Sequence, residues 1–138
     1  MEAEKADVQA VLDKVIEATK NGNIEMFSET TAHDKDLVCI GTARNENLKG
    51  WEQLKEAMLK QFNTLENTDI VVNERIIKVY HSGKVAWFSE NLDFQFTMKE
   101  KPYSFKGVRQ TGVLEKRDGK WLIVQIHMSV PMEAGEDF

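Results

Sequence analysis

Residues 85–98 constrain the fold more than any other part of the chain, because their side chains alternate strictly. One row is apolar apart from Glu90, and the opposite row is mostly polar. The first row consists of Ala86, Phe88, Glu90, Leu92, Phe94, Phe96 and Met98, and the second includes Ser89, Asn91, Asp93, Gln95 and Thr97. A period of two residues indicates a β-strand with one buried and one exposed face.

Three neighbouring segments also predict strands. Residues 70–80 are rich in β-branched side chains, and the segments 103–116 and 120–130 are joined by the turn residues Asp118-Gly119. Ser82-Gly83 marks a turn ahead of the alternating segment. We therefore expect a curved antiparallel sheet whose long strands lie in the second half of the chain.

The first half of the chain predicts helices. Residues 8–19 place apolar side chains at helical spacing, and Asn21-Gly22 supplies a stop signal. Asn23 can then cap a short second helix. A short strand at residues 37–40 and a polar loop precede a third helix at residues 51–65, which carries one apolar stripe. Helices followed by strands indicate the α+β class.

Length and charge bound the organisation and the partners of the chain. Its 138 residues are enough for one domain, which we place at residues 1–131, followed by an acidic tail at residues 132–138. The net charge of -5 argues against a nucleic-acid partner. No segment has the roughly 20 apolar residues of a membrane span, and the start lacks a signal peptide. A single cysteine, Cys39, favours the cytoplasm, where thiols stay reduced.

The register of the last hairpin decides which side chains share a face. A two-residue turn at Asp118-Gly119 pairs Arg117 with Lys120, whereas a three-residue loop pairs Lys116 with Lys120. The three-residue loop places Val108, Gly112 and Leu114 with Leu122, Val124, Ile126 and Met128, and gathers Arg109, Thr111, Gln125, His127 and Ser129 on the other face. We predict the three-residue loop, because it keeps polar side chains with polar side chains. It leaves Trp121 and Ile123 on the outer face with Trp87.

The residues of this hairpin resemble a known closing motif. They read Arg109-x-Thr111-x-Val113 and then Arg117-Asp118-Gly119-Lys120-Trp121-x-Ile123-Val124-x-x-His127-x-Ser129. The motif is similar to that of the SnoaL-like branch of the nuclear transport factor 2-like superfamily, and especially to the association domain of calcium/calmodulin-dependent protein kinase type II. The resemblance implies a cone-shaped fold, with a strongly bent antiparallel sheet and helices covering its concave face. It also implies a homodimer through the convex face. Relatives include isomerases, cyclases, dehydratases and non-catalytic assembly domains, so no activity follows from the fold.

The chain departs from that kinase domain at three pocket positions. An ungapped alignment places the arginines of the kinase-domain pocket on Leu92, Gly112 and Met128, which are all uncharged. A pocket without these arginines does not favour small carboxylates, because an anion without a partner is costly in a dry cavity.

Glu90 and Gln110 are the polar groups expected on the inner face. A carboxylate among Phe88, Leu92 and Phe94 has its pKa raised by desolvation, which suits a general acid or base. The alternatives are that Glu90 lies at the rim or hydrogen-bonds Gln110. The expected walls of the pocket are Phe62, Phe88, Leu92, Phe94 and Met128, with Gln110 as a polar anchor. The orientation of Arg75 is left open by the pattern.

The outer face is expected to form an interface. Trp87, Arg109 and His127 are the candidate interface residues, and His127 is interpreted as a hydrogen-bonding partner of Arg109 or Ser129 rather than as a catalytic group. The histidines have no metal-ligand spacing and Cys39 has no paired cysteine, so neither a metal nor another cofactor is predicted.

Three functional hypotheses follow. The first is a dimeric pocket protein that binds a small, largely apolar molecule. The second is a proton-transfer enzyme, such as an isomerase or cyclase, with Glu90 as the base. The third is an oligomerisation domain without catalysis. The sequence favours the first and identifies neither a ligand nor a reaction.

Overall fold

Three helices and six strands make up the computed structural model, which describes residues 2–132. The helices are α1 (Glu2–Asn21), α2 (Ile24–Thr30) and α3 (Trp51–Thr64). The strands are β1 (Val38–Ile40), β2 (Asn47–Lys49), β3 (Glu66–Val79), β4 (Val85–Met98), β5 (Lys101–Arg117) and β6 (Lys120–Ser129). Apart from Met132, the predicted acidic tail lies outside the described residues.

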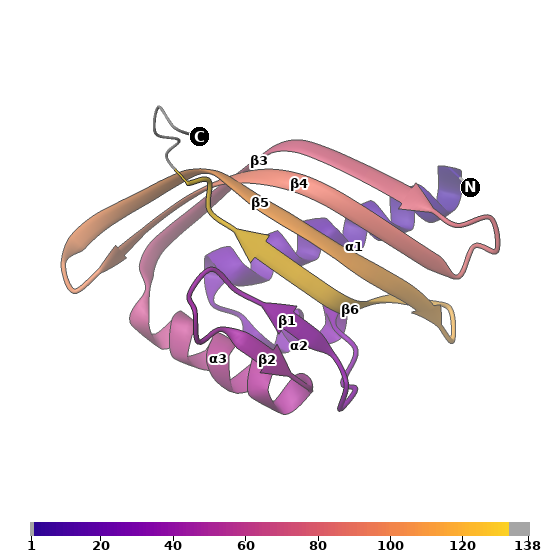
Figure 1. The fold of residues 1–138 in the computed structure, drawn as a ribbon, viewed down its shortest axis with the longest axis horizontal. Helices are drawn as coiled ribbons and strands as arrows, with labels where there is room; N and C mark the ends of the chain where they lie inside the picture. Colours follow the sequence, from indigo (N-terminus) through magenta and orange to yellow (C-terminus); the bar gives the residue numbers. More distant parts are fainter. Residues whose placement is uncertain (1, 133–138) are drawn as a thin grey trace.

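The strands form one sheet in the order β2-β1-β6-β5-β4-β3, and its long strands arch over the helices (Figure 1). The four long strands are antiparallel neighbours, and the α+β class is confirmed. The short β1 runs parallel to β6, which makes the sheet mixed. The sequence did not predict β2, because Leu48 is its single apolar residue.

The helices end close to where the pattern placed them, but α1 begins at Glu2, six residues before the first apolar residue of the predicted helix. Asn23 caps α2 as expected, since its side-chain oxygen accepts a hydrogen bond from the Met26 backbone N–H at 3.1 Å. Along α1 the buried residues are Val8, Leu12, Val15 and Ala18, which recur at helical spacing and belong to one core cluster with side chains of the sheet. This amphipathic face holds α1 against the sheet, where the helix contacts mainly β3 and also β6.

The last hairpin differs from the predicted register. Arg117 pairs with Lys120, so the turn has two residues, and both Asp118 and Gly119 take the positive φ angles that such a turn requires. Further from the turn, Val113 pairs with Gln125 but Leu114 pairs with Ile123, which leaves Val124 as an extra residue. A β-bulge of this kind reverses which side chains of the strand point to each face of the sheet.

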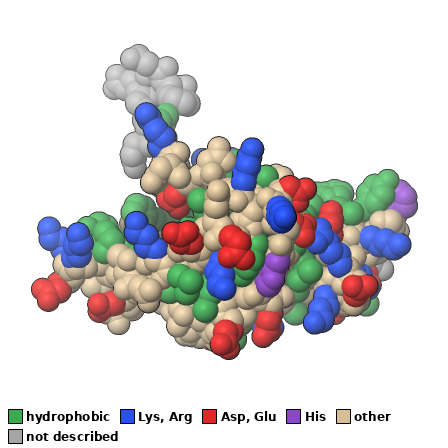
Figure 2. Space-filling model, turned by 90° about the horizontal axis from the view of Figure 1, so that it is seen from below, with side chains coloured by type: hydrophobic (Ala, Val, Ile, Leu, Met, Phe, Trp, Pro, Cys, Tyr) green, Lys and Arg blue, Asp and Glu red, His purple; other side chains and the backbone are tan. Residues whose placement is uncertain are grey.

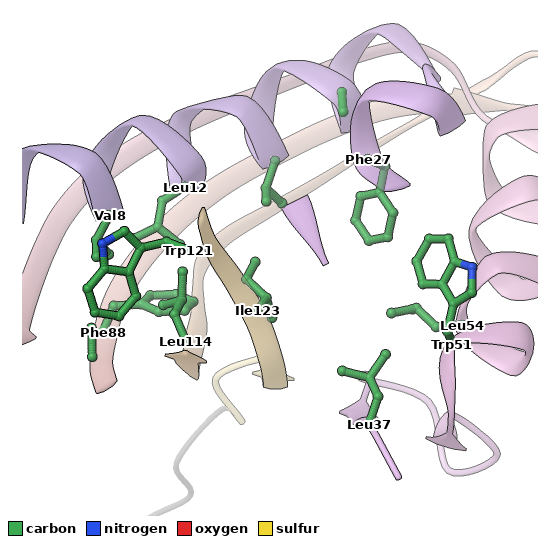
Figure 3. Packing of buried hydrophobic residues seen from close by; sticks show 13 residues of the cluster. Val8, Leu12, Phe27, Leu37, Trp51, Leu54, Phe88, Leu114, Trp121 and Ile123 are labelled. Carbon is green, nitrogen blue, oxygen red and sulfur yellow. The ribbon is translucent and has the colours of Figure 1, made fainter. Parts of the chain in front are cut away.

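The bulge corrects three assignments near the turn and explains why the assignments beyond it agree. Beyond Val124 the side chains face the sides that a three-residue loop produces, so Gly112 shares a face with Ile126. The pairing itself is shifted by two residues, because Gly112 pairs with Ile126 where the three-residue loop pairs it with Val124. Nearer the turn, Trp121 and Ile123 lie on the inner face, not on the predicted outer face, and both are buried. Leu122 alternates with them and pairs with Glu115, so it lies on the outer face, not on the predicted inner face. Figure 3 shows Trp121 within the buried cluster that also contains Val8 and Phe88.

A second irregularity bends the sheet between Leu92 and Phe94. Leu92 pairs with Val108 and Phe94 pairs with Phe105, so β5 contributes one more residue than β4 at this point. Asp93 accepts a hydrogen bond from the Gly107 backbone N–H at 3.1 Å and thereby holds the bend. The bend turns the end of the β4–β5 hairpin toward the helices, where its aromatic side chains become part of a cavity wall.

Candidate functional site

A cavity of about 340 Å³, partly open to solvent, lies on the concave side of the sheet. Its walls come from α1, α2, α3, β1 with the following loop, β4, β5 and β6. Most of the lining side chains are apolar. They include Val15, Phe27, Leu54, Met58, Phe94, Phe96, Phe105, Val108, Ile126 and Met128. This arrangement suits a molecule whose surface is largely apolar.

Three of the expected pocket residues line the cavity and three do not. Phe94, Gln110 and Met128 are part of its wall. Phe88 and Leu92 are buried in the core instead, because the helices pack directly on the middle of β4. Phe62 turns its ring edge-on to Phe27, with 6.5 Å between ring centroids, and lies outside the lining.

The aromatic part of the wall extends beyond what the sequence predicted. Phe96 stands 5.7 Å from Phe94, measured between ring centroids, and 6.0 Å from Phe105. Tyr103 stacks on the other side of Phe96 at 5.3 Å. The alternating row of β4 already placed Phe96 on the inner face. Phe105 comes to lie beside Phe96 only because of the register shift at Gly107. Three phenylalanine rings therefore form a continuous apolar surface on one side of the cavity.

Glu90 is buried, with 2% of its surface exposed, yet it does not line the cavity. Its Oε2 accepts a hydrogen bond of 2.7 Å from Nε of Arg75. The Nη1 group of Arg75 in turn donates to Asp13 on α1. Glu90 therefore lies neither at the rim nor in a hydrogen bond with Gln110. Its partner is Arg75, whose orientation the sequence pattern left open.

The ion pair decides the electrostatics around Glu90. Burial raises the pKa of the Glu90 carboxyl above its ordinary value, while the hydrogen bond and the charge of Arg75 act in the opposite direction. The Arg75 Nη2 group is buried without a hydrogen-bond partner among the described residues. The group Asp13–Arg75–Glu90 thus ties α1 to β3 and β4, and a guanidinium rather than a ligand faces the Glu90 carboxylate.

A bulge explains how Arg75 reaches the inner face. Val72 pairs with Leu92 and Glu74 pairs with Asn91, so Asn73 is an extra residue on β3. The alternation therefore changes phase within β3, and Arg75 comes to lie opposite Glu90. A pattern that changes phase inside one strand does not reveal which face its later residues occupy.

Gln110 lies in the cavity wall beside this group. It pairs with Glu90 across β4 and β5, is 7% exposed, and lines the cavity. Its amide carries both hydrogen-bond donors and an acceptor. A ligand group of either kind can therefore be held at this point of the wall.

Strand β1 and the loop that follows it add two groups that sequence reasoning did not select. Cys39 and Glu46 both line the cavity. Burial, with a smaller effect of the Glu46 charge, raises the pKa of the Cys39 thiol to about 11, so the thiol is protonated at neutral pH. The Glu46 carboxylate accepts a hydrogen bond from the Ala43 backbone N–H at 3.1 Å. Nothing in the sequence pattern marks Glu46, because it lies in a polar loop whose conformation depends on pairing of β1 with β6.

The convex face presents the three residues that the sequence assigned to an interface. Trp87 is 43% exposed, and Arg109 and His127 are exposed as well. Arg109 Nε donates a hydrogen bond of 3.0 Å to the hydroxyl of Ser129. A shallow hollow of about 430 Å³ lies on this face beside Trp87, lined also by Ile76, Thr111 and Gln125.

The face seen from below shows charges of both signs. Viewed from below the orientation of Figure 1, basic and acidic side chains are interspersed with apolar ones (Figure 2). Within residues 2–132, no group of three or more histidine, cysteine, aspartate or glutamate side chains is placed to hold a metal ion. None of the helices in that range is long and apolar enough to cross a membrane.

Comparisons with known proteins agree with this architecture. A sequence model of the SnoaL-like domain matches residues 8–133. None of the curated proteins compared with the chain matches it. A nuclear transport factor 2-like superfamily protein from Salmonella enterica superimposes with a TM-score of 0.87 and 16% identity, over 98% of this chain and 96% of the other.

Two further solved structures are similar. A candidate association domain of calcium/calmodulin dependent protein kinase II from Xanthomonas campestris has a TM-score of 0.77 and 29% identity, over 92% of this chain and 87% of the other. A candidate dehydratase of the nuclear transport factor 2-like family from Streptomyces avermitilis has a TM-score of 0.85 and 14% identity, over 96% of this chain and 99% of the other. The resemblance that the hairpin motif suggested, and the fold it implied, are confirmed.

Proposed function

The chain belongs to the SnoaL-like domain family, and on that premise we propose that it is a homodimeric pocket protein that binds a small, largely apolar molecule beneath its sheet. The observation that carries this proposal is the cavity of about 340 Å³ with its mostly apolar lining. That volume falls at the lower end of the roughly 300–1,000 Å³ found for small-molecule sites.

The wall supports binding more than it supports catalysis. Phe94, Phe96 and Phe105 provide apolar contact area, and Gln110 provides a hydrogen-bonding group among them. A few polar groups in an apolar cavity orient a ligand without reacting with it. Cys39 is a weak nucleophile here, because its thiol stays protonated at neutral pH.

The enzyme hypothesis rests on one observation, the raised pKa of the buried Glu90. A general base has to come within about 3 Å of the proton it removes, directly or through one water. Glu90 lies outside the cavity lining and its Oε2 is engaged by Arg75. For Glu90 to act as a base, Arg75 has to release it, so this hypothesis ranks second.

The convex face supports the dimer part of the proposal. Trp87 is a large apolar side chain exposed among Ile76, Thr111 and Gln125 on an otherwise polar sheet face. Aromatic and arginine side chains are enriched in interfaces, which fits Trp87 and Arg109. A second copy placed on this face by two-fold symmetry brings the same side chains together from both subunits. The oligomerisation hypothesis is thereby part of the same proposal, with or without a ligand.

Binding in the cavity is tested by blocking it from α3. Gln61 lines the cavity and is only half-buried, so Gln61→Trp adds an indole to the cavity with little disturbance of the core. Lys60→Trp, one residue away and exposed, is the matched control. We expect isothermal titration calorimetry with 4-phenylbutan-1-ol to show binding to the unmodified protein and to Lys60→Trp, and none to Gln61→Trp.

Two results contradict the proposal. One is that the unmodified protein does not bind this probe and that native mass spectrometry shows no co-purified molecule. The other is equal binding to both tryptophan variants, which places the probe outside the cavity.

A further inference from the structure

The cavity wall carries a negative charge, that of the Glu46 carboxylate. We infer that the ligand carries a positive charge: an organic ammonium group attached to an apolar or aromatic body, with Glu46 as its counter-ion. This inference rests on the proposed function, because it names the class of molecule that the cavity takes. Among the lining residues that lie within 2–132, Glu46 is the single carboxylate, and none is a lysine, arginine or histidine.

An anionic ligand is disfavoured by this wall. A carboxylate that enters an apolar cavity loses its hydration and needs a cation or several donors in return. Here it meets a like charge at Glu46 instead. The guanidinium on the inner face, Arg75, lies outside the lining and is already engaged by Asp13 and Glu90. The wall therefore disfavours anions in two ways: it offers no cation to pair with them, and the Glu46 carboxylate repels them.

The loop between β1 and β2 holds the Glu46 carboxylate in place. Its Oε1 accepts the Ala43 N–H at 3.1 Å, and the Glu46 backbone carbonyl accepts the Gly41 N–H at 2.7 Å. The carboxylate folds over Gly41 so closely that a side chain at position 41 would clash with Glu46 Oε2. Gly41 therefore makes room for a carboxylate that is fixed in position before any ligand arrives, which lowers the entropic cost of binding.

The rest of the cavity suits the body of such a molecule. Phe94, Phe96 and Phe105 form an apolar surface, and Gln110 adds an uncharged hydrogen-bonding group. Cys39 is also uncharged, since burial keeps its thiol protonated. No other ionisable group in the lining competes with the ligand for the Glu46 carboxylate.

Three probes with one body separate the head groups. They are 4-phenylbutylamine, which is an ammonium ion at pH 7, the neutral 4-phenylbutan-1-ol, and the anion 4-phenylbutanoate. We expect calorimetry to show the amine binding about tenfold more tightly than the alcohol, as one charge-assisted contact provides. The carboxylate should bind about tenfold more weakly than the alcohol.

The variant Glu46→Gln removes the charge while its amide oxygen can still accept the Ala43 N–H, so the loop keeps its conformation. We expect the preference for the amine to disappear in this variant and the affinity for the alcohol to stay the same. Glu56→Gln changes the net charge equally, but Glu56 is exposed on α3 and outside the lining. It should keep the full preference.

Each failure has its own reading. If none of the three probes binds and native mass spectrometry shows no co-purified molecule, the proposed function itself fails, and this inference with it. If the alcohol binds but the amine binds no more tightly, or the carboxylate binds best, the cavity takes ligands and the inference about charge is wrong. It is also wrong if Glu56→Gln reduces the preference as much as Glu46→Gln does.

Discussion

The guanidinium of Arg75 on β3 lies opposite the carboxylate of Glu90 on β4, and their hydrogen bond of 2.7 Å is buried between the sheet and α1. Only 10% of the Arg75 side chain and 2% of the Glu90 side chain are exposed. Because the second contact of Arg75 is with Asp13, one cation holds together two carboxylates from distant parts of the chain. This group controls both the stability of the helix–sheet packing and the protonation of Glu90.

Removing the cation should destabilise the protein in a pH-dependent way. Arg75→Met leaves Glu90 buried without its partner, which costs about 3–5 kcal/mol at pH 7. The pKa of Glu90, already raised by burial, then rises further because the opposing effect of Arg75 is lost. A carboxyl with a raised pKa in the folded state stabilises the fold below its ordinary value of 4.5, and this contribution is lost as the pH rises through the folded-state pKa.

The difference in stability between Arg75→Met and the unmodified protein should therefore be smallest near pH 4.5 and largest at neutral pH. Urea unfolding at several pH values measures it. The double variant Arg75→Met/Glu90→Gln is the control, because it removes the buried charge and should recover part of the loss at pH 7. A loss that does not change with pH would show that lost packing, not the unpaired carboxylate, dominates.

Gly112→Ala should destabilise the fold by overpacking. An added Cβ would stand 2.5 Å from the Gln125 carbonyl oxygen and 2.7 Å from a ring carbon of Phe88. Forcing a methyl group into a packed site costs about 1–3 kcal/mol. In a Phe88→Leu background part of the clash is removed, so the additional cost of Gly112→Ala should be smaller there. Thermal unfolding of the four variants of this cycle measures the coupling, and an equal cost in both backgrounds would contradict the close approach of Phe88.

Cys39 should react slowly with thiol reagents. A pKa of about 11 instead of the ordinary 9.0 lowers the thiolate fraction at pH 8 about a hundredfold. We expect Ellman's reagent to modify the folded protein at least that much more slowly than the urea-unfolded protein, where the thiol is solvated. Saturation with a probe that binds in the cavity should slow the reaction further, because Cys39 lines that cavity. Equal rates in the folded and unfolded protein would exclude the buried thiol described above.

Trp87 should contribute to self-association. If the convex face forms a symmetric dimer, Trp87→Ala removes a central aromatic contact, and a hot-spot loss of about 2 kcal/mol raises the dissociation constant about 30-fold. Leu59→Ala is the matched control, since Leu59 is an exposed apolar residue on α3 and lies away from the sheet. Light scattering coupled to size-exclusion chromatography over a dilution series separates the two variants. An unmodified protein that is monomeric at all concentrations would refute the dimer.

The faces of the sheet could be predicted from the sequence where the alternation is unbroken. The β4 boundaries agree with the pattern, and its inner row from Ala86 to Phe96 faces the helices. Errors arise where one extra residue changes the phase. The extra residue Val124 places Trp121 and Ile123 on the inner face. There the Trp121 indole N–H donates a hydrogen bond of 2.8 Å to Glu4, which lies near the start of the chain. No local pattern contains that contact.

The site was predictable only in part for the same physical reason. The inner-face positions of Gln110 and Met128 agree with the prediction because the bulge restores the predicted alternation of faces, although the pairing is shifted by two residues. The pairing of Arg75 with Glu90, in contrast, depends on the extra residue Asn73. Glu46 depends on a loop whose shape is fixed by tertiary pairing, so its position in the cavity wall cannot be read from composition or periodicity.

The contact between Arg75 and Asp13 also bears on the order of events during folding. Sixty-two positions separate the two residues in the sequence, so the contact closes a long loop, and we expect it to form only after α1 reaches the assembled sheet. Interactions made after the transition state slow unfolding and leave the folding rate almost unchanged. The Asp13–Arg75–Glu90 group would then slow unfolding and so lengthen the lifetime of the folded molecule, with little effect on the folding rate.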